Sequence, residues 1–137
     1  MRRTHLLRLA FYTAILVATL HVLAVVFFLY WSLWWFDIPP HLLGGLSVGL
    51  FSLWFFCADK GGGSTISSLR VLSVAVLGAL VVGLVWELFE YSAGITYNAI
   101  GSYPLDTLKD LTMDVTGGYV AHFYFLIKGY HKPPHHV

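Results

Sequence analysis

The stretch LAFYTAILVATLHVLAVVFFLY, residues 9–30, contains no Asp, Glu, Lys or Arg. A helix needs about 20 apolar residues to cross the hydrocarbon core of a bilayer, so this stretch is long enough to span a membrane. Arg2, Arg3 and Arg8 precede it, and such a charged start is typical both of a signal peptide and of a retained helix. The apolar run exceeds the roughly 7–15 residues of a signal peptide, and no small-residue cleavage site precedes the bulky sequence YWSLWW at 30–35. We therefore interpret the stretch as a retained transmembrane helix.

The composition indicates a membrane protein. Of the 137 residues, 58% are hydrophobic and 11% are charged, whereas about a quarter of the residues of a soluble domain carry charge. The formal net charge of +1 provides no basic face for a nucleic-acid backbone, so nucleic acid is excluded as a main partner. Cys57, the only cysteine, lies in an apolar run, which excludes an intramolecular disulfide and a cysteine metal cluster. The lipid bilayer is the first partner that the composition predicts.

Three further apolar stretches follow the first, each after a polar or proline-containing segment. We expect membrane spans at about residues 9–30, 41–57, 69–89 and 105–127. The second span follows two prolines, the third follows a glycine-rich loop at 59–64, and the fourth follows Pro104. The pattern predicts an all-α integral membrane protein in which residues 1–137 form a single membrane domain, a small bundle of four transmembrane helices.

The positive charges indicate how the spans are oriented. Lys and Arg in short loops are retained on the cytoplasmic side of a membrane. With four spans, the basic residues on the side of both termini are Arg2, Arg3, Arg8, Lys60, Arg70, Lys128 and Lys132. Only Lys109 falls on the other side. We therefore expect a multi-pass protein of the cell inner membrane with both termini in the cytoplasm.

Most acidic residues fall in the opposite half of the molecule, where three helices would deliver ionisable groups to one level. These groups are His41, Glu87, Glu90, Asp106, Asp110 and Asp114. Asp106, Asp110 and Asp114 are spaced i, i+4 and i+8, which places them along one face of a helix at steps of about 6 Å. An ionisable side chain at the centre of an isolated membrane helix costs roughly 2.5–3.5 kcal/mol, so these groups must face one another, water or a cation. We expect them to form a ligand pocket on the extracytoplasmic side.

Packed carboxylates repel one another unless some are protonated or a divalent cation neutralises them. The cation alternative predicts a metal site whose candidate ligands are Glu87, Glu90, Asp106 and Asp110. Oxygen ligands alone would suit Mg²⁺, Ca²⁺ or Mn²⁺, whereas adding His41 moves the preference toward Mn²⁺, Fe²⁺ or Zn²⁺. No residue is assigned a catalytic role, because the sequence contains no Ser-His-Asp arrangement.

Simpler interpretations exist for several of these residues. Asp106 could merely favour the positive end of a helix dipole, and Asp110 could pair with Lys109. The two glutamates could be ordinary interfacial residues. His21, in the middle of the first stretch, fits a neutral histidine bonded across helices better than a proton relay. The histidines at 131–136 lie in a short tail that could chelate a metal adventitiously.

Three segments carry a recognisable pattern, namely PHLLGG at 40–45, WELFEY at 86–91 and DTLKDLTMDVTGG at 106–118. They resemble the His-x-x-Gly segment, the Trp-Glu-x-x-Glu helix end and the Asp-rich helix of VanZ-like membrane proteins and of related uncharacterised bacterial inner-membrane families. The resemblance covers about residues 40–120, with the motifs in the right order.

The resemblance implies a small helical membrane bundle with a link to the cell envelope and to glycopeptide antibiotic resistance, and it brings no established chemistry. The positions that it carries over as a site are His41, Glu87, Glu90, Asp106, Asp110, Asp114 and Gly117. Asp114 stands where many relatives carry Asn, which would change the charge of the site.

Three functions fit this pattern. The first is metal-assisted chemistry on a lipid-linked or envelope substrate at the outer leaflet, with Asp114 as a base or as a partner of the metal ligands. The second is a non-enzymatic binding or transport element whose acidic pocket takes a cation, a proton or a polar ligand. The third is an accessory subunit whose polar residues hold helices or a partner protein together, and the glycines would also permit a homodimer. The density of carboxylates favours the enzyme and the absence of a nucleophile or cofactor motif disfavours it, so whether the protein is an enzyme stays open.

Overall fold

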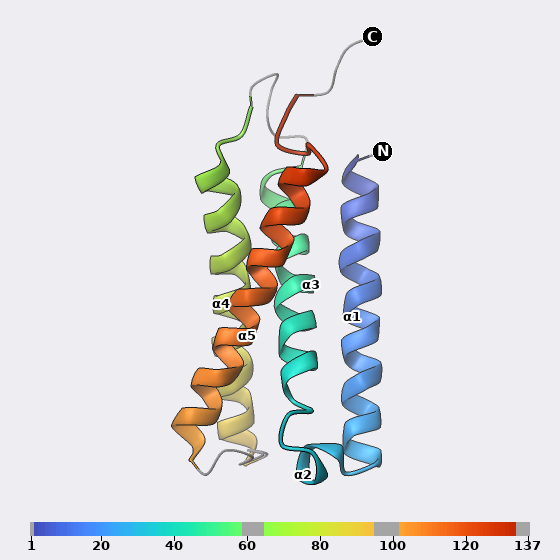
Figure 1. Cartoon of the computed structure of the whole chain (residues 1–137), viewed down its shortest axis with the longest axis vertical. Helices are drawn as coiled ribbons and strands as arrows, with labels where there is room; N and C mark the ends of the chain where they lie inside the picture. Colours follow the sequence, from blue (N-terminus) through green and yellow to red (C-terminus); the bar gives the residue numbers. More distant parts are fainter. Residues whose placement is uncertain (1, 59–64, 95–101, 134–137) are drawn as a thin grey trace.

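The computed structural model describes residues 2–58, 65–94 and 102–133, and its helices form an elongated bundle (Figure 1). The helices are α1 (Arg2–Val26), α2 (Leu29–Ser32), α3 (Ile38–Phe56), α4 (Ser68–Ala93) and α5 (Tyr103–Ile127). No strand occurs among the described residues, as the predicted all-α class requires. The start of α1 and the end of α5 lie at one end of the bundle, and α2 and the starts of α3 and α5 lie at the other. The loop predicted at 59–64 and the histidines at 135–136 lie outside the described residues.

The first helix differs most from its predicted boundaries. α1 begins at Arg2, because the residues before the apolar stretch continue the same helix, and it ends at Val26 rather than at Tyr30. Phe28 has a φ of 56°, in the left-handed region that does not occur within a right-handed helix, so the chain turns there. Tyr30 then lies in the short helix α2, where its hydroxyl is 3.0 Å from Nδ1 of His21. The chain therefore folds back on α1 before α3 begins.

Prolines and a glycine set the boundaries of α3 and α4. α3 begins at Ile38, so Pro39 and Pro40 lie within its first turn, where a backbone N–H would have no partner in the helix and its absence costs nothing. α4 continues past residue 89, its predicted end, until Gly94 ends it with a φ of 68°. Glu90 lies inside the helix, as its predicted place at the end of the third span requires.

Three of the four long helices, α1, α3 and α4, are long and apolar enough to cross a membrane. α5 is equally long, but it is not among the candidate spans found in the described residues, because charged side chains fall in its first half. These charged side chains belong to Asp106, Lys109, Asp110 and Asp114. α5 packs against α3 and α4 and its three aspartates are buried there. The helices are those of a multi-pass membrane protein, while four spans with cytoplasmic termini remain a prediction.

α3 lies at the centre of the bundle, in contact with α1, α4 and α5 (Figure 1). Glycines let α3 and α5 approach each other closely. A Cβ atom on Gly45 would collide with the backbone carbonyl of Asp114, and one on Gly117 would collide with the backbone carbonyl of Leu42. Small residues at such contacts are how membrane helices pack without bulky side chains between them. The close approach brings the polar face of α5 against the first turns of α3.

The backbone of α1 packs against that of α3. The hydroxyl of Ser47 in α3 donates a hydrogen bond to the carbonyl oxygen of Ala10 at 2.8 Å, and the guanidinium of Arg3 lies 5.0 Å from the ring centre of Trp54. Within the described residues, no Cα atom of α1 comes within 8 Å of a Cα atom in α4 or α5. The backbones of α1 and α4 therefore stand apart on either side of α3.

The apolar core fills the end of the bundle where α1 begins and α5 ends. Its fully buried side chains include Leu6, Leu50, Val71 and Phe125, one from each long helix. Large apolar side chains also cover the outside of the helices, as expected of surfaces that face lipid. Buried polar side chains lie at the opposite end of the bundle, which we call the polar end.

Candidate functional site

The polar end of the bundle collects side chains from two segments that lie far apart in the sequence. Asp37 directly precedes α3, and His41 occupies the first turn of that helix. The facing side chains of α5 are Asp106, Asp110 and Asp114. These three aspartates and His41 are between 2% and 8% exposed. The packing of α5 on α3 therefore brings the three aspartates to the level of the histidine.

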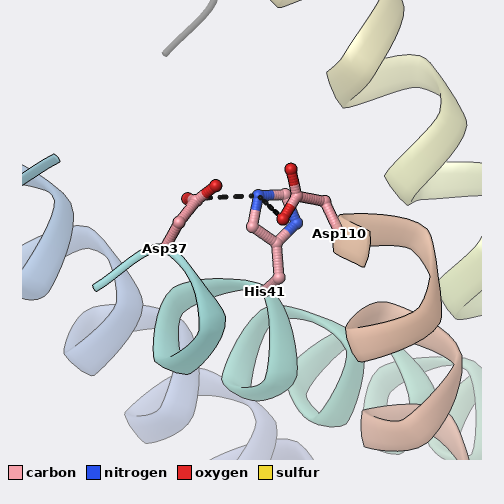
Figure 2. A group of neighbouring side chains, drawn as sticks. All are labelled: Asp37, His41 and Asp110. Atoms are coloured by element: carbon pink, nitrogen blue, oxygen red, sulfur yellow. Dashed lines mark ion pairs between the residues drawn. The ribbon is translucent and has the colours of Figure 1, made fainter. Parts of the chain in front are cut away.

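His41 lies between carboxylates (Figure 2). Its Nε2 atom is 3.5 Å from Oδ1 of Asp37 and 4.0 Å from Oδ1 of Asp110. Its Nδ1 atom is 3.4 Å from Oδ2 of Asp114. Asp37, His41 and Asp110 each offer one ligand atom, and these atoms all lie within 4.8 Å of one another. We call these three residues the Asp-His-Asp group, and a single metal ion could contact all of them.

Lys109 places a cation beside the same carboxylates. Its Nζ atom lies 2.8 Å from Oδ1 of Asp106, 3.1 Å from Oδ1 of Asp110 and 3.3 Å from Oδ2 of Asp37. Only 12% of the lysine side chain is exposed, so these ion pairs are largely shielded from water. Three carboxylates therefore pair with this ammonium group, and Asp114 adds a fourth carboxylate to the cluster through its contact with His41. The formal charge of the cluster is negative even if His41 is protonated.

Asp110 is the most deeply buried carboxylate of the cluster, and one of its oxygens retains capacity to accept. Oδ1 of Asp110 accepts no hydrogen bond from any described residue, although the ammonium of Lys109 lies near it. Figure 2 shows this carboxylate turned toward the ring of His41. A buried charged oxygen without hydrogen bonds is costly, because it has lost its water without full replacement. The ammonium of Lys109 already places a positive charge 3.1 Å from this oxygen, so a metal ion would share the oxygen with Lys109.

Two glycines make room for the carboxylate of Asp114. A Cβ atom on Gly83 of α4 would collide with Oδ2 of Asp114, and one on Gly44 of α3 would lie 3.9 Å from Oδ1. The carboxylate therefore lies between α3 and α4 at a place that a larger residue at 83 would close. In this position it faces Nδ1 of His41, the ring nitrogen that points away from the Asp-His-Asp group.

The two glutamates of α4 lie outside the Asp-His-Asp group. Glu87 is 4% exposed, and its Oε2 accepts a hydrogen bond from the hydroxyl of Thr107 at 2.8 Å, which joins α4 to α5. Its Oε1 accepts none from the described residues. Glu90 is half-buried and lines a cavity together with His41. Of the four metal ligands expected from the sequence, only Asp110 belongs to the Asp-His-Asp group, and Asp106 pairs with Lys109 instead.

Sequence reasoning misses Asp37 as a member of the site. Asp37 lies in the segment before the prolines, where no helix is expected, yet α3 begins one residue later. Its spacing of i, i+4 to His41 is the available signal, because residues four apart share one side of a helical turn. Lys109 is expected only as a partner of Asp110, whereas in the structure it contacts three carboxylates.

One family model matches nearly the whole chain. It is described as "predicted membrane protein (DUF2238)", and the match covers residues 1–131. No curated protein and no solved structure matches the chain. The description agrees with the three helices that are long and apolar enough to cross a membrane, and it supports an uncharacterised membrane family rather than VanZ-like proteins specifically.

Proposed function

The chain belongs to the DUF2238 family of predicted membrane proteins, and we propose that its Asp-His-Asp group binds one divalent metal ion. The observation that carries the proposal is the position of His41, with Nε2 facing Asp37 and Asp110 and Nδ1 facing Asp114. A histidine that binds a metal usually donates its other ring N–H to a carboxylate or carbonyl, which fixes the orientation and tautomer of the ring. Asp114 takes that supporting position here.

The ligand atoms would have to move closer together around an ion, because they lie within 4.8 Å of one another. Ligand atoms about 2.1 Å from one ion lie roughly 3.0–3.5 Å apart in octahedral or tetrahedral geometry. The separations of 3.5 Å and 4.0 Å from Nε2 of His41 to the two carboxylates are close to this range. One imidazole and two carboxylates suit Mn²⁺, Fe²⁺ or Zn²⁺, whereas Mg²⁺ and Ca²⁺ prefer oxygen ligands alone. We therefore propose Mn²⁺, Fe²⁺ or Zn²⁺ as the ion.

We further propose that the site faces the extracytoplasmic side of the inner membrane. Basic residues at the far end of the bundle support this orientation, because such residues are retained in the cytoplasm. These residues are Arg3, Arg8, Arg70, Lys128 and Lys132. The resemblance to VanZ-like proteins supports a role in the cell envelope, in which the bound ion would contact a polar or lipid-linked envelope ligand.

A second candidate function rests on Lys109. Its ammonium joins Asp37, ahead of α3, to Asp106 and Asp110 of α5, so the cluster can also serve to hold two helices together. Removing one partner from a buried ion pair is strongly destabilising, because the remaining charge is left without a partner. In this account the carboxylates are structural, and no metal ion binds.

Asp37→Asn tests the metal proposal against the ligand set expected from the sequence. We expect this variant to lower the affinity of the detergent-purified protein for Mn²⁺ by at least about tenfold, the smallest loss seen for residues that only support a metal ligand, because an amide is a weaker ligand than a carboxylate. Glu87→Gln is the matched control, since Glu87 bonds to Thr107 and lies outside the Asp-His-Asp group. The free Mn²⁺ signal in electron paramagnetic resonance measures both affinities.

Three outcomes would contradict the proposal. A loss of affinity in Glu87→Gln with normal binding by Asp37→Asn would favour the ligand set of Glu87, Glu90, Asp106 and Asp110. Normal binding in both variants would place the ion elsewhere. Failure of the unmodified protein to bind Mn²⁺, Fe²⁺ or Zn²⁺ would leave the structural role of Lys109 as the explanation of the cluster.

A further inference from the structure

A cavity of about 410 Å³ lies between α1, α3 and α4. It exists because α1 and α4 both pack on α3 while their backbones stand apart from each other. The volume is within the range of small-molecule sites, roughly 300–1,000 Å³. Its walls hold side chains that are exposed on the outside of the bundle, such as Ala18 and Val82, so the cavity opens where lipid would lie.

The lining of the cavity is mostly apolar, with acidic side chains at one end. The apolar part is formed by Ala14, Val17, Ala18, Val48, Ala79 and Val82. The part toward α2 and the start of α3 is formed by polar side chains, including Asp37, His41, Glu90 and Asp114. Asp37, which directly precedes α3, and Val48 within α3 both line the cavity, and a rise of 1.5 Å per residue separates them by about 16 Å. No Lys or Arg lies among the lining residues.

Aromatic rings separate the two parts. The ring of His21 lies 5.9 Å from that of Trp86 in an edge-on arrangement, which joins α1 to α4 across the cavity. The hydroxyl of Tyr30 is 3.0 Å from Nδ1 of His21. All three side chains line the cavity. Aromatic faces next to carboxylates attract positively charged groups.

We propose that this cavity binds a membrane amphiphile with one hydrocarbon chain and a positively charged amine head. The chain lies between α1 and α4 along the apolar part, and the amine lies between Glu90 and Asp114, next to the rings of Trp86 and Tyr30. The charge near the head selects it, because Glu90 forms no ion pair with Lys or Arg among the described residues and Asp114 pairs with His41, so these two carboxylates would repel a phosphate. This inference does not require a bound metal ion, although Asp37 and His41 belong both to the cavity lining and to the proposed metal site.

The test uses three amphiphiles that share one chain length, namely dodecylamine, dodecanol and dodecyl phosphate. They are titrated into the full-length protein held in an amphipathic polymer, and binding is measured by calorimetry. The buffer contains a metal chelator, so that the result does not depend on a bound metal. We expect one dodecylamine per chain, with an affinity at least tenfold higher than that of dodecyl phosphate and higher than that of dodecanol.

Two variants locate the binding. Ala18→Phe fills the apolar part and should lower the affinity for dodecylamine at least tenfold, whereas Val22→Phe, on an exposed face of α1 outside the cavity, should leave it unchanged. Glu90→Gln should reduce the preference for the amine over the alcohol without filling the cavity. Ala18→Phe and Glu90→Gln change opposite ends of the cavity, so if one variant fails to fold, the other still tests the proposal.

Several results would overturn the proposal. Equal binding of the amine and the phosphate would contradict the choice of head, and unchanged dodecylamine binding in both Ala18→Phe and Glu90→Gln would place the amphiphile elsewhere. A helix from a second copy could also fill such a cavity. In that case dodecylamine would not bind, and Ala18→Phe would convert a dimer into a monomer. Since the buffer removes metal ions, each of these failures is distinct from a failure of the metal proposal.

Discussion

Asp110→Asn is expected to lower the affinity of the protein for Mn²⁺ by at least about 100-fold. This loss equals or exceeds the largest losses of affinity that follow when a residue that only supports a metal ligand is changed. Asp110 is 2% exposed, and its Oδ1 accepts no hydrogen bond from the described residues while lying 4.0 Å from Nε2 of His41. The amide that replaces this oxygen keeps the shape of the side chain but removes its charge. The Mn²⁺ titration described above measures the change.

Asp106→Asn is the matched control for Asp110→Asn. The two aspartates are one helical turn apart on α5 and both contact Lys109, but only Asp110 belongs to the Asp-His-Asp group. We expect Asp106→Asn to change the affinity by less than about tenfold, the lower bound of effects on residues that support metal ligands. Equal losses in the two variants would show that the charge of the cluster, rather than the position of Asp110, controls binding.

Gly45→Ala is expected to lower the free energy of unfolding by about 3 kcal/mol, the upper end of the usual cost of overpacking. A Cβ atom at this position would collide with the carbonyl carbon and oxygen of Asp114. These are backbone atoms, so the clash cannot be relieved by a change of rotamer, and α3 and α5 must move apart. Because Asp114 belongs to the site, the same change should also weaken metal binding. Unfolding in a denaturing detergent, followed by circular dichroism, measures the free energy.

Gly44→Ala provides a control at the neighbouring position. A Cβ atom on Gly44 would lie 3.9 Å from Oδ1 of Asp114, an ordinary contact distance. Alanine within a helix is more favourable than glycine by roughly 0.5–1 kcal/mol, so this variant should be as stable as the unmodified protein or slightly more stable. Equal destabilisation by the two changes would contradict the close contact between α3 and α5 at Gly45.

Three of the long helices, α1, α3 and α4, could be expected from the sequence because their apolar length alone defines them, whereas α5 carries charged residues in its first half. The ends of these helices are harder to predict, because each depends on the backbone conformation of one or two residues. The turn at Phe28 ends α1 at Val26 and brings Tyr30 back to His21, but no polar residue or proline in the sequence marks this turn. The two prolines at 39–40 were read as a boundary, although prolines are equally compatible with the first turn of a helix.

The site could be anticipated along each helix but not between helices. The spacing of Asp106, Asp110 and Asp114 places them on one face, and in the structure all three are buried. The rotation of α4 about its axis is not encoded in any spacing, so the contact of Glu87 with Thr107 was not predictable. The position of Asp37 depends on where α3 begins, which the prolines obscured. Sequence reasoning consequently predicts a site at this level of the helices, and one of its four proposed metal ligands, Asp110, belongs to the Asp-His-Asp group.

The central claim, that the polar end of the bundle holds a divalent metal ion, is tested most directly by elemental analysis of the purified protein. The protein should carry His135→Ala and His136→Ala, so that the histidines of the C-terminal tail do not chelate metal during purification. We predict one Mn²⁺, Fe²⁺ or Zn²⁺ per chain and none in the same protein with Asp110→Asn. No divalent metal in protein produced with these ions supplied, or equal amounts in the two samples, would contradict the account.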